Sequence, residues 1–280
     1  MKKILITGNS GYIGSHLSKM LKDEYIVCGM DIVQPQVQPQ IHYYNDIRRP
    51  VDIAEEFDCV IHLAALVNVG ESEQIPIQYY ITNLNGTMNI LNKIKTKNFV
   101  FASTGAAEGC SSAYGISKRA AEDVVREYCT QHRPIPYTIF RFYNVIGSEG
   151  FEPTNPDGLM SNLIKAVDTG TFTIHGTDYD VSNDGTCVRD YVHVMEICDA
   201  IKTAIEKPSN SVECLGHGVG YTVREMVTMF QQVNDVDFLI SSGPRRKGDL
   251  PSSVLEDVSP YMRNLYTMEQ LLSVSTIMSK

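Results

Sequence analysis

A tyrosine and a lysine stand four residues apart in SSAYGISKRAAED, where a helix is expected to begin. Residues with this spacing share one helix face, so the Lys118 ammonium can reach toward Tyr114. A phenol has a pKa of about 10, and a nearby positive charge stabilises the phenolate, which favours its use as a general base. Ordinary helices have the same spacing, with residues such as Val124 and Val125 packed inward. The pair alone favours this plainer interpretation and leaves the catalytic one open.

Short apolar runs alternate with amphipathic segments in the first half of the chain, and these elements must position any such pair. The expected buried strands are KILITG, YIVCGMD, DCVIHLAA, NFVFAST and YTIFRFYN. This alternation indicates a parallel sheet with helices on both faces. After about Gly147 turn-forming segments such as GFEPTNPDG become frequent. The sequence therefore predicts an α/β fold, with a doubly wound parallel (Rossmann) sheet over residues 1–147 and a smaller C-terminal domain over residues 148–280.

A glycine-rich turn follows the first expected strand, where ITGNSGYIGSHLSKML places Gly8, Gly11 and Gly14 before a helix. Glycines here allow a tight turn, close approach of the backbone to a pyrophosphate, and a helix N-terminus that faces the phosphates. The second strand ends at Asp31, 17 residues after Gly14. A carboxylate there can accept hydrogen bonds from an adenosine ribose and would repel a 2′-phosphate. These features predict a site that prefers NAD over NADP.

Composition argues against several other classes of function. The net charge of −9, without a basic run, argues against a nucleic-acid partner. The seven cysteines form no C-x-x-C pair or metal-ligand spacing, and their odd number argues against a disulfide framework. We therefore expect a cytoplasmic protein without a metal site. The first apolar run is too short for a signal peptide, and no stretch is long enough to cross a membrane.

Glycines spaced G-x-x-G-x-x-G together with Tyr-x-x-x-Lys resemble the extended branch of the short-chain dehydrogenase/reductase superfamily. Further segments are similar to the UDP-galactose (UDP-hexose) 4-epimerases: VIHLAALVNVGES, YYITNLNGTMNIL, FRFYNVIG, GTDY with DGTCVRDYVHVMEICDA, and GPRRKGDLP. The resemblance covers nearly the whole chain. It implies NAD-dependent 4-epimerisation of UDP-Glc/UDP-Gal, UDP-GlcNAc/UDP-GalNAc or both, and a C-terminal domain that mainly binds the nucleotide sugar, with some segments returning to the first domain.

The resemblance also implies catalytic roles. Tyr114 would remove the proton of the sugar 4-hydroxyl while hydride passes from C4 to the nicotinamide, and Lys118 would lower the tyrosine pKa and hold the nicotinamide ribose. Thr104 matches the Ser/Thr that hydrogen-bonds the sugar 4-oxygen, and Ser103 is its less favoured neighbour. The 4-keto intermediate would turn over and recover the same hydride on its other face, which regenerates NAD.

The same resemblance implies a cofactor wall and a substrate anchor. The expected cofactor residues are Gly8, Gly11, Tyr12, Ile13, Gly14, Asp31, Asp46, Ile47, Leu63, Ala64, Ala65, Asn83, Ser103, Tyr114, Lys118 and Phe142. The expected substrate residues are Thr104, Tyr143, Asn144, Leu159, Arg189, Arg246, Asp249 and Ser253. Asp46 and Ile47 would pack on adenine, and the arginines suit phosphate because a guanidinium makes charge-assisted, often bidentate, hydrogen bonds. For His62, a structural role is favoured.

Departures from the family pattern bear on the reaction. Only nine residues separate Thr104 from Tyr114, fewer than in relatives. Related dehydratases and decarboxylases place an acid directly after the Ser/Thr, whereas Gly105 and Ala106 stand here, so dehydration is disfavoured. Ser253 replaces a bulky tyrosine of epimerases limited to glucose and galactose, which leaves room for a 2-acetamido group.

Two alternatives remain beside the epimerase. One is a nucleotide-sugar dehydratase or reductase, and the other is a non-catalytic NAD-binding regulator, which the presence of both Tyr114 and Lys118 disfavours. The resemblance further implies a homodimer in which helices near residues 83–94 and 114–129 pack against their copies. The same apolar positions could instead face the sheet of their own subunit.

Overall fold

The computed structural model of the chain describes residues 1–148, 150–153, 155–246, 248–262 and 266–274. The chain forms two compact units. The first contains Met1–Phe142 and Cys198–Glu213, and the second contains Tyr143–Ile197 and Cys214–Lys280. The polypeptide therefore leaves the first unit after Phe142, returns to it at Cys198 and leaves it again after Glu213.

A seven-stranded sheet forms the centre of the first unit, in the order β12-β8-β7-β5-β1-β2-β3. Its strands are β1 (Lys3–Thr7), β2 (Ile26–Asp31), β3 (Ile41–Tyr44), β5 (Cys59–His62), β7 (Phe99–Thr104), β8 (Tyr137–Phe142) and β12 (Asn210–Leu215). The pairings from β3 through to β8 are all parallel. The strand order reverses between β1 and β5, and ligands of doubly wound sheets bind at the carboxyl ends of the strands beside such a reversal. The predicted doubly wound parallel sheet is confirmed.

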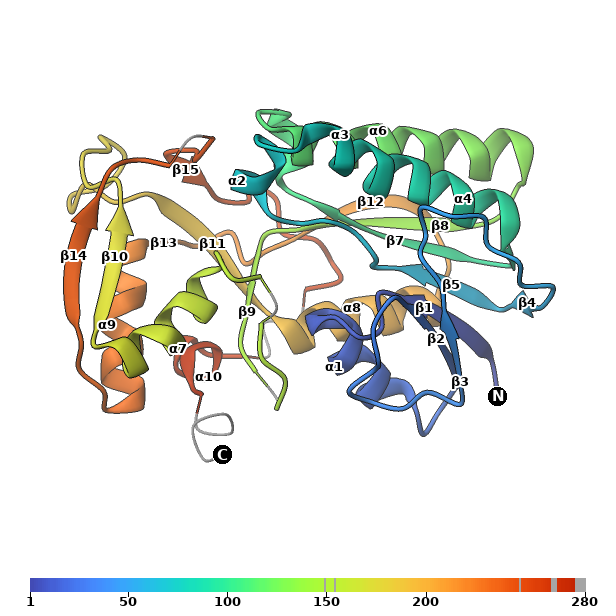
Figure 1. The fold of residues 1–280 in the computed structure, drawn as a ribbon, viewed down its shortest axis with the longest axis horizontal. Helices are drawn as coiled ribbons and strands as arrows, with labels where there is room; N and C mark the ends of the chain where they lie inside the picture. Colours follow the sequence, from blue (N-terminus) through green and yellow to red (C-terminus); the bar gives the residue numbers. More distant parts are fainter. Residues whose placement is uncertain (149, 154, 247, 263–265, 275–280) are drawn as a thin grey trace. The chain divides into compact units, whose positions relative to one another are not determined.

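Helices cover both faces of this sheet (Figure 1). One face carries α1 (Tyr12–Leu21) and α8 (Val194–Glu206), and the other carries α3 (Pro76–Tyr79), α4 (Gly86–Lys93) and α6 (Ala113–Glu127). A π-helix, η1 (Tyr80–Asn85), joins α3 to α4, and a second, η2 (Tyr128–His132), follows α6. The shorter elements of this unit are α2 (Val69–Ser72), α5 (Ala106–Gly109), β4 (Glu56–Phe57) and β6 (Lys95–Thr96).

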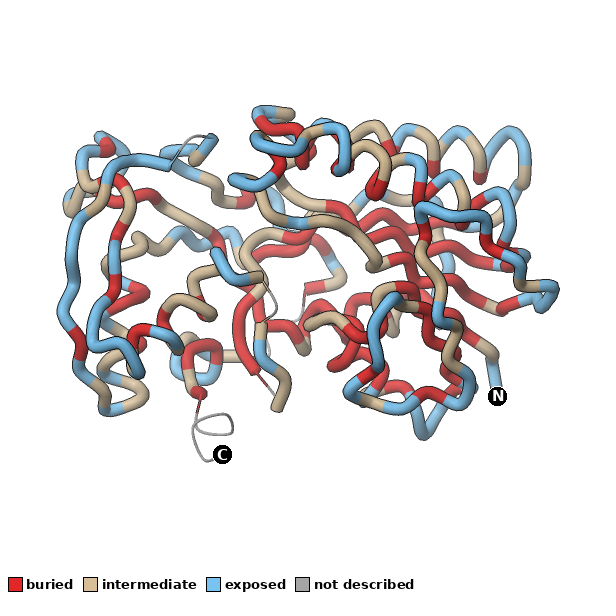
Figure 2. The backbone as a smooth tube through the Cα atoms, in the orientation of Figure 1, coloured by how far each residue is buried: buried red, intermediate tan, exposed pale blue. Residues whose placement is uncertain are grey.

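Helix α6 is fixed by its first residue and by its buried face. The Ser112 side chain caps the helix by accepting a hydrogen bond of 3.1 Å from the backbone N–H of Gly115, which satisfies one of the unpaired donors of a helix start. Ala121 and Val125 pack into the core beside Phe101. Figure 2 shows the buried strands and the exposed outer sides of the helices. Tyr114 and Lys118 are also buried, so they belong to the inward part of the helix surface.

The second unit is built on short strands. β11 (Val188–His193) pairs with β9 (Asn144–Ile146), β13 (Gly220–Thr222) and β15 (Ser252–Ser253), and β10 (Thr171–His175) pairs with β14 (Leu239–Gly243). Its helices are α7 (Leu159–Thr169), α9 (Val223–Asn234) and α10 (Met268–Leu272). A separate apolar core includes Leu163, Phe172 and Phe230. A capping box between Thr222 and Glu225 defines the start of α9.

Candidate functional site

The Tyr114 hydroxyl meets the end of strand β7. Thr104, the last residue of β7, lies close enough to Tyr114 for its side chain to favour the phenolate by hydrogen bonding, which lowers the Tyr114 pKa. The short connection between them is tightly built, because Thr104 Oγ1 also accepts the N–H of Ala106 at 3.2 Å. A Cβ on Gly115 would lie only 2.4 Å from the Ala106 carbonyl oxygen, so glycine permits this close approach of α5 to α6. Ser103, the preceding residue, donates its hydroxyl proton to Glu122.

Burial changes the proton affinity of both members of the tyrosine-lysine pair. It raises the pKa of Tyr114 to about 12, although the hydrogen bond with Thr104 acts in the opposite direction. It lowers the pKa of Lys118 to about 7, and the nearby Glu122 carboxylate partly offsets this. In the protein alone the Tyr114 pKa is thus higher than that of a free phenol. The sequence analysis had considered the lysine charge and not the desolvation of the phenolate.

The Lys118 ammonium lies over an aromatic ring and near a neutral histidine. Its Nζ is 4.1 Å from the ring centre of Phe101. His62 is buried, with Nδ1 2.6 Å from Thr7 Oγ1 and Nε2 3.0 Å from Thr87 Oγ1. Burial, followed by the positive charge of Lys118, lowers the pKa of His62 to about 3. His62 therefore has the structural role expected of it.

The glycine turn after β1 is packed so closely that side chains at its glycines would collide with neighbouring backbone atoms. Gly8 has φ +75°, and a Cβ there would lie 2.7 Å from the Ala64 nitrogen. A Cβ on Gly14, on the first turn of α1, would lie 2.1 Å from the Gly8 carbonyl oxygen. Asn9 is fully buried, and neither amide atom has a hydrogen-bond partner within the described part of the chain. A close turn before a helix N-terminus fits a dinucleotide pyrophosphate.

Residues beside this turn complete the expected cofactor wall. The Asp31 carboxylate, at the end of β2, accepts the N–H groups of Ser10 at 3.0 Å and Ile32 at 2.7 Å. This holds a negative group next to the turn, as a ribose site requires. Tyr12 and Ile13 open α1 and are half-buried, and Gly11 is the residue before the helix.

Other predicted cofactor residues follow β5 and β8. Leu63, Ala64 and Ala65 come directly after β5 and are half-buried. Phe142 ends β8 and is paired with Thr104 in the strand register. These strand ends lie at the carboxyl edge of the sheet, together with the glycine turn.

Three predicted cofactor residues make contacts that the sequence analysis did not include. The Asn83 amide accepts the Leu66 N–H at 2.8 Å and donates to the Leu66 carbonyl at 3.0 Å, so it fixes the segment after β5. Asp46 is paired with Arg48 at 2.6 Å, which keeps the pKa of the carboxyl below its usual value. Ile47 is buried and packs closely on Gly86.

Strand pairing in the second unit brings several predicted substrate residues together. Arg189 on β11 is opposite Ser253 on β15, and Asn144 on β9 is opposite Tyr191. The Asn144 side chain donates to the Asp190 carbonyl at 3.0 Å.

Arg189 also shares surroundings with the remaining charged residues of the predicted anchor. Arg246 and Asp249 form an ion pair at 3.3 Å. The charges of Arg189, Arg246 and Asp249 all act on the buried thiol of Cys187. These three groups therefore all lie in the neighbourhood of Cys187 within the second unit.

Tyr143 and Leu159 make backbone and core contacts in this unit. The Tyr143 N–H donates to the Leu215 carbonyl at 3.1 Å. Leu159 opens α7 and packs against the apolar core.

Two buried polar residues, one in each unit, were not predicted from the sequence. The Tyr179 hydroxyl is buried without a partner among the described residues, and Asp249 and Arg189 act electrostatically on it. Its ring lies 4.1 Å beneath the Arg245 guanidinium. Glu122 is fully buried one turn after Lys118. The spacing of four residues after Lys118 was the only sequence signal for Glu122.

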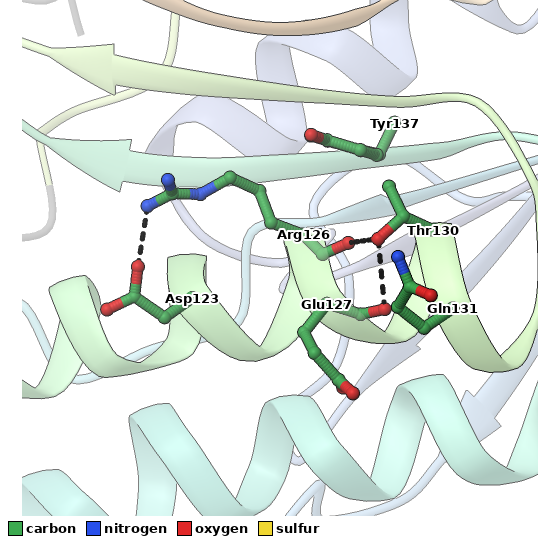
Figure 3. Close-up of a pocket in the computed structure, with 6 residues that line it drawn as sticks. All are labelled: Asp123, Arg126, Glu127, Thr130, Gln131 and Tyr137. Atoms are coloured by element: carbon green, nitrogen blue, oxygen red, sulfur yellow. Dashed lines mark hydrogen bonds and ion pairs between the residues drawn. The ribbon is translucent and has the colours of Figure 1, made fainter.

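A shallow groove of about 310 Å³ lies at the opposite end of α6 from Tyr114 (Figure 3). It is lined by Asp123, Arg126, Glu127, Thr130, Gln131 and Tyr137. Arg126 pairs with Asp123 at 2.6 Å, and Thr130 Oγ1 donates to the Arg126 carbonyl at 2.7 Å. The groove is therefore an open surface whose polar groups bind one another.

The described residues contain neither a metal-binding cluster nor a membrane-spanning helix. No cluster of His, Cys, Asp or Glu there could hold a metal ion. None of the helices in the same residues is both long and apolar enough to span a bilayer.

Comparisons with known proteins agree with this geometry. Residues 4–215 match the model of the NAD dependent epimerase/dehydratase family. A UDP-glucose 4-epimerase of Yersinia pestis is 32% identical over 297 residues, covering 89% of this chain and 88% of the relative. One from Bacillus subtilis (strain 168) is 32% identical over 294 residues, covering 88% and 86%. The crystal structure of UDP-glucose 4-epimerase from Bifidobacterium longum in complex with NAD+ and UDP is 26% identical, covers 96% of each chain and gives a TM-score of 0.84.

Proposed function

Because the chain belongs to the NAD dependent epimerase/dehydratase family, we propose that it catalyses the NAD-dependent 4-epimerisation of a UDP-hexose through a 4-keto intermediate. The observation that carries the proposal is that Tyr114 and Lys118 are both buried on α6, with Tyr114 close to Thr104 at the carboxyl edge of the sheet. Relatives that are 32% identical along most of the chain are UDP-glucose 4-epimerases.

In this reaction Tyr114 removes the proton of the sugar 4-hydroxyl, and Thr104 hydrogen-bonds the same oxygen. Bound NAD would supply the hydride acceptor and a positive charge close to the hydroxyl. The Tyr114 pKa of about 12 in the protein alone means that the phenolate needs positive charge nearby at neutral pH. Lys118 provides such a charge when it is protonated. The same tyrosine returns a proton to the sugar oxygen after hydride has come back to the other face of C4.

The chain offers NAD a backbone cradle at Gly8, Gly11 and Gly14, where added side chains would collide with the turn. Tyr12 and Ile13 open the helix whose N-terminus faces the cradle. We assign the ribose to Asp31 and the adenine to the segment with Asp46 and Ile47. Leu63, Ala64, Ala65, Asn83, Ser103 and Phe142 complete the wall.

The second unit is proposed to hold the UDP group. Arg189 and Arg246 are suited to the diphosphate because guanidinium groups bind phosphate oxygens in bidentate fashion. Asp249 can accept from ribose hydroxyls, and Tyr143, Asn144 and Leu159 are assigned to the remaining contacts.

Ser253 is expected to set the range of hexoses. It lies next to Arg189 in the strand register. A serine occupies far less volume than a tyrosine, so we propose that a 2-acetamido group is accepted. Both UDP-Glc/UDP-Gal and UDP-GlcNAc/UDP-GalNAc would then be substrates.

We further propose a cytoplasmic homodimer. The seven cysteines are free, which suits a reducing compartment. Ile77, Met88 and Ile116 are exposed on α3, α4 and α6, which lie on the same face of the sheet (Figure 1). Large apolar side chains gathered on one face favour association. Sedimentation at several protein concentrations tests this, and a monomer at every concentration would contradict it.

The function is tested by incubating the purified protein with UDP-Glc, and separately with UDP-GlcNAc, and resolving the products by proton NMR. We expect both 4-epimers, without net consumption of cofactor, and no product from Tyr114→Phe. A lasting fall in reduced-nicotinamide absorbance when NADH is added would favour the reductase, and a product that has lost water without net change in the cofactor would favour the dehydratase. NAD binding without turnover, even when NAD is added, would favour the regulator.

A further inference from the structure

A buried carboxylate on α6 takes no direct part in the proposed reaction. Glu122 is completely buried, and it forms two hydrogen bonds with Arg141 on β8. Arg141 Nη2 lies 2.7 Å from Oε2, and Arg141 Nε lies 2.9 Å from Oε1. This is the bidentate arrangement in which a guanidinium fixes direction as well as distance. The pair therefore sets the position of α6 against β8.

The same pair reaches the other elements that carry the catalytic groups. The Ser103 hydroxyl donates to Glu122, which attaches β7 directly before Thr104. Arg141 also pairs with Glu108 at 3.1 Å, which attaches α5 in the short connection between Thr104 and Tyr114. One arginine and one glutamate thus join α6, β7, β8 and α5.

Stability alone is a weak reason for such a pair, because desolvation of two buried charges consumes most of their attraction. The Glu122–Arg141 pair has a second effect, because the Glu122 carboxylate acts on the charge of Lys118. The groups that face this ammonium are Glu122 on α6, the neutral His62 on β5 and the Phe101 ring on β7. Of these, Glu122 carries the negative charge. It opposes the tendency of burial to remove the lysine proton.

We propose that Glu122 and Arg141 are positioning residues of the active site, which hold α6 against the end of β7 so that Tyr114 meets Thr104, while the Glu122 carboxylate supports the charge of Lys118. This inference rests on the proposed function and deepens it. It predicts two separable effects, one of geometry and one of charge.

The test compares Glu122→Gln, Glu122→Asp and the matched control Asp123→Asn. Asp123 is the next residue on α6, and its side chain is exposed and paired with Arg126 at the surface. The measurements are kcat and KM for UDP-Glc between pH 6 and 10. A lysine Cε NMR titration is run in parallel, with the Lys118 signal assigned by its loss in Lys118→Met. Circular dichroism and bound NAD report whether each variant folds.

In Glu122→Gln, removal of the negative charge favours loss of the lysine proton. We expect the Lys118 midpoint and the alkaline limb of kcat to move down by about one pH unit, a tenfold change in proton affinity. We expect kcat to fall about tenfold or more with KM changed far less, because small displacements of catalytic groups are costly. Glu122→Asp keeps the charge but shortens the reach, so its Lys118 midpoint should stay near that of the parent while kcat falls. Asp123→Asn should resemble the parent.

An unchanged Lys118 midpoint in Glu122→Gln would overturn the charge role. An unchanged kcat in Glu122→Asp would overturn the positioning role, and this variant decides the matter if Glu122→Gln does not fold. If the parent protein forms no epimer, the proposed function fails. The Lys118 titration still separates failure of the proposed function from failure of this inference. A lower Lys118 midpoint in Glu122→Gln supports the effect of Glu122 on Lys118 without any measurement of turnover.

Discussion

Lys118 is a buried cation, and replacing it with methionine should stabilise the protein while abolishing its activity. Burial, partly offset by Glu122, leaves the lysine with a pKa of about 7 against an ordinary value of 10.5. At about 1.4 kcal/mol per pKa unit, this difference amounts to roughly 5 kcal/mol of folding free energy lost at low pH. The cation–π contact of Nζ with the Phe101 ring offsets up to about 2 kcal/mol of this folding free energy. Lys118→Met removes both contributions, so we expect a net gain of about 3 kcal/mol near pH 6.

The pH dependence gives the sharper test. Between the two pKa values of Lys118 the unfolded chain binds more protons than the folded protein, so the stability of the parent rises with pH there. The cost is complete below a pH of about 7 and disappears above a pH of about 10.5. From pH 6.5 to 9 the advantage of Lys118→Met should therefore shrink by about 2.5 kcal/mol.

Urea unfolding at pH 6.5 and 9, without added cofactor and with bound NAD measured in each preparation, provides the two free energies. Lys93→Met is the matched control, since Lys93 is exposed on α4, and surface substitutions usually change stability by less than about 0.5 kcal/mol. Epimerase activity of Lys118→Met should fall by about a hundredfold or more. The reasoning is refuted if Lys118→Met is less stable than the parent at pH 6.5, or if the difference does not shrink by pH 9.

Three further substitutions test separate parts of the site. Tyr114→Phe should lower kcat about a hundredfold or more while circular dichroism stays unchanged; turnover equal to that of the parent would remove Tyr114 from the chemistry. Ser253→Tyr should reduce kcat/KM for UDP-GlcNAc at least about tenfold with little change for UDP-Glc, and equal activity on both sugars would contradict the proposed pocket. Gly8→Ala should cost about 1–3 kcal/mol of stability and weaken NAD retention, because φ is +75° and the Cβ would lie 2.7 Å from the Ala64 nitrogen; unfolding and bound-NAD measurements equal to those of the parent would contradict this.

The sheet could be predicted because its signals are local. Apolar runs of strand length, such as KILITG and NFVFAST, are separated by helical segments, and this alternation permits few other arrangements. The glycine turn has the same advantage, because its three glycines lie within seven residues. What such patterns omit is desolvation, so the raised pKa of Tyr114 could not be read from the lysine four residues away.

Most features of the site that could not be predicted from the sequence are contacts between residues that are far apart along the chain. Glu122 and Arg141 are 19 residues apart, and in the sequence Glu122 is one charged residue among several on an amphipathic helix. Tyr179 and Asp249 come from segments separated by four strands and two helices. The Asp46–Arg48 ion pair is local, yet several side chains in that polar stretch could have formed it. Side-chain geometry decides such pairings, and it depends on packing across the whole unit.

The return of residues 198–213 to the first unit has a consequence for how the protein is synthesised. Strand β12 is the neighbour of β8 in the large sheet, so β8 keeps an open edge until about residue 215 has left the ribosome. Asn98, which precedes β7, donates a hydrogen bond of 3.0 Å to the carbonyl of Ala204. This bond likewise cannot form until residue 204 has been synthesised. A nascent or truncated chain that ends near residue 147 exposes an apolar parallel sheet with a free edge, the kind of surface on which strands of other chains assemble. The first unit is therefore completed late in translation, and expression of residues 1–147 alone should produce aggregates rather than an independent cofactor-binding domain.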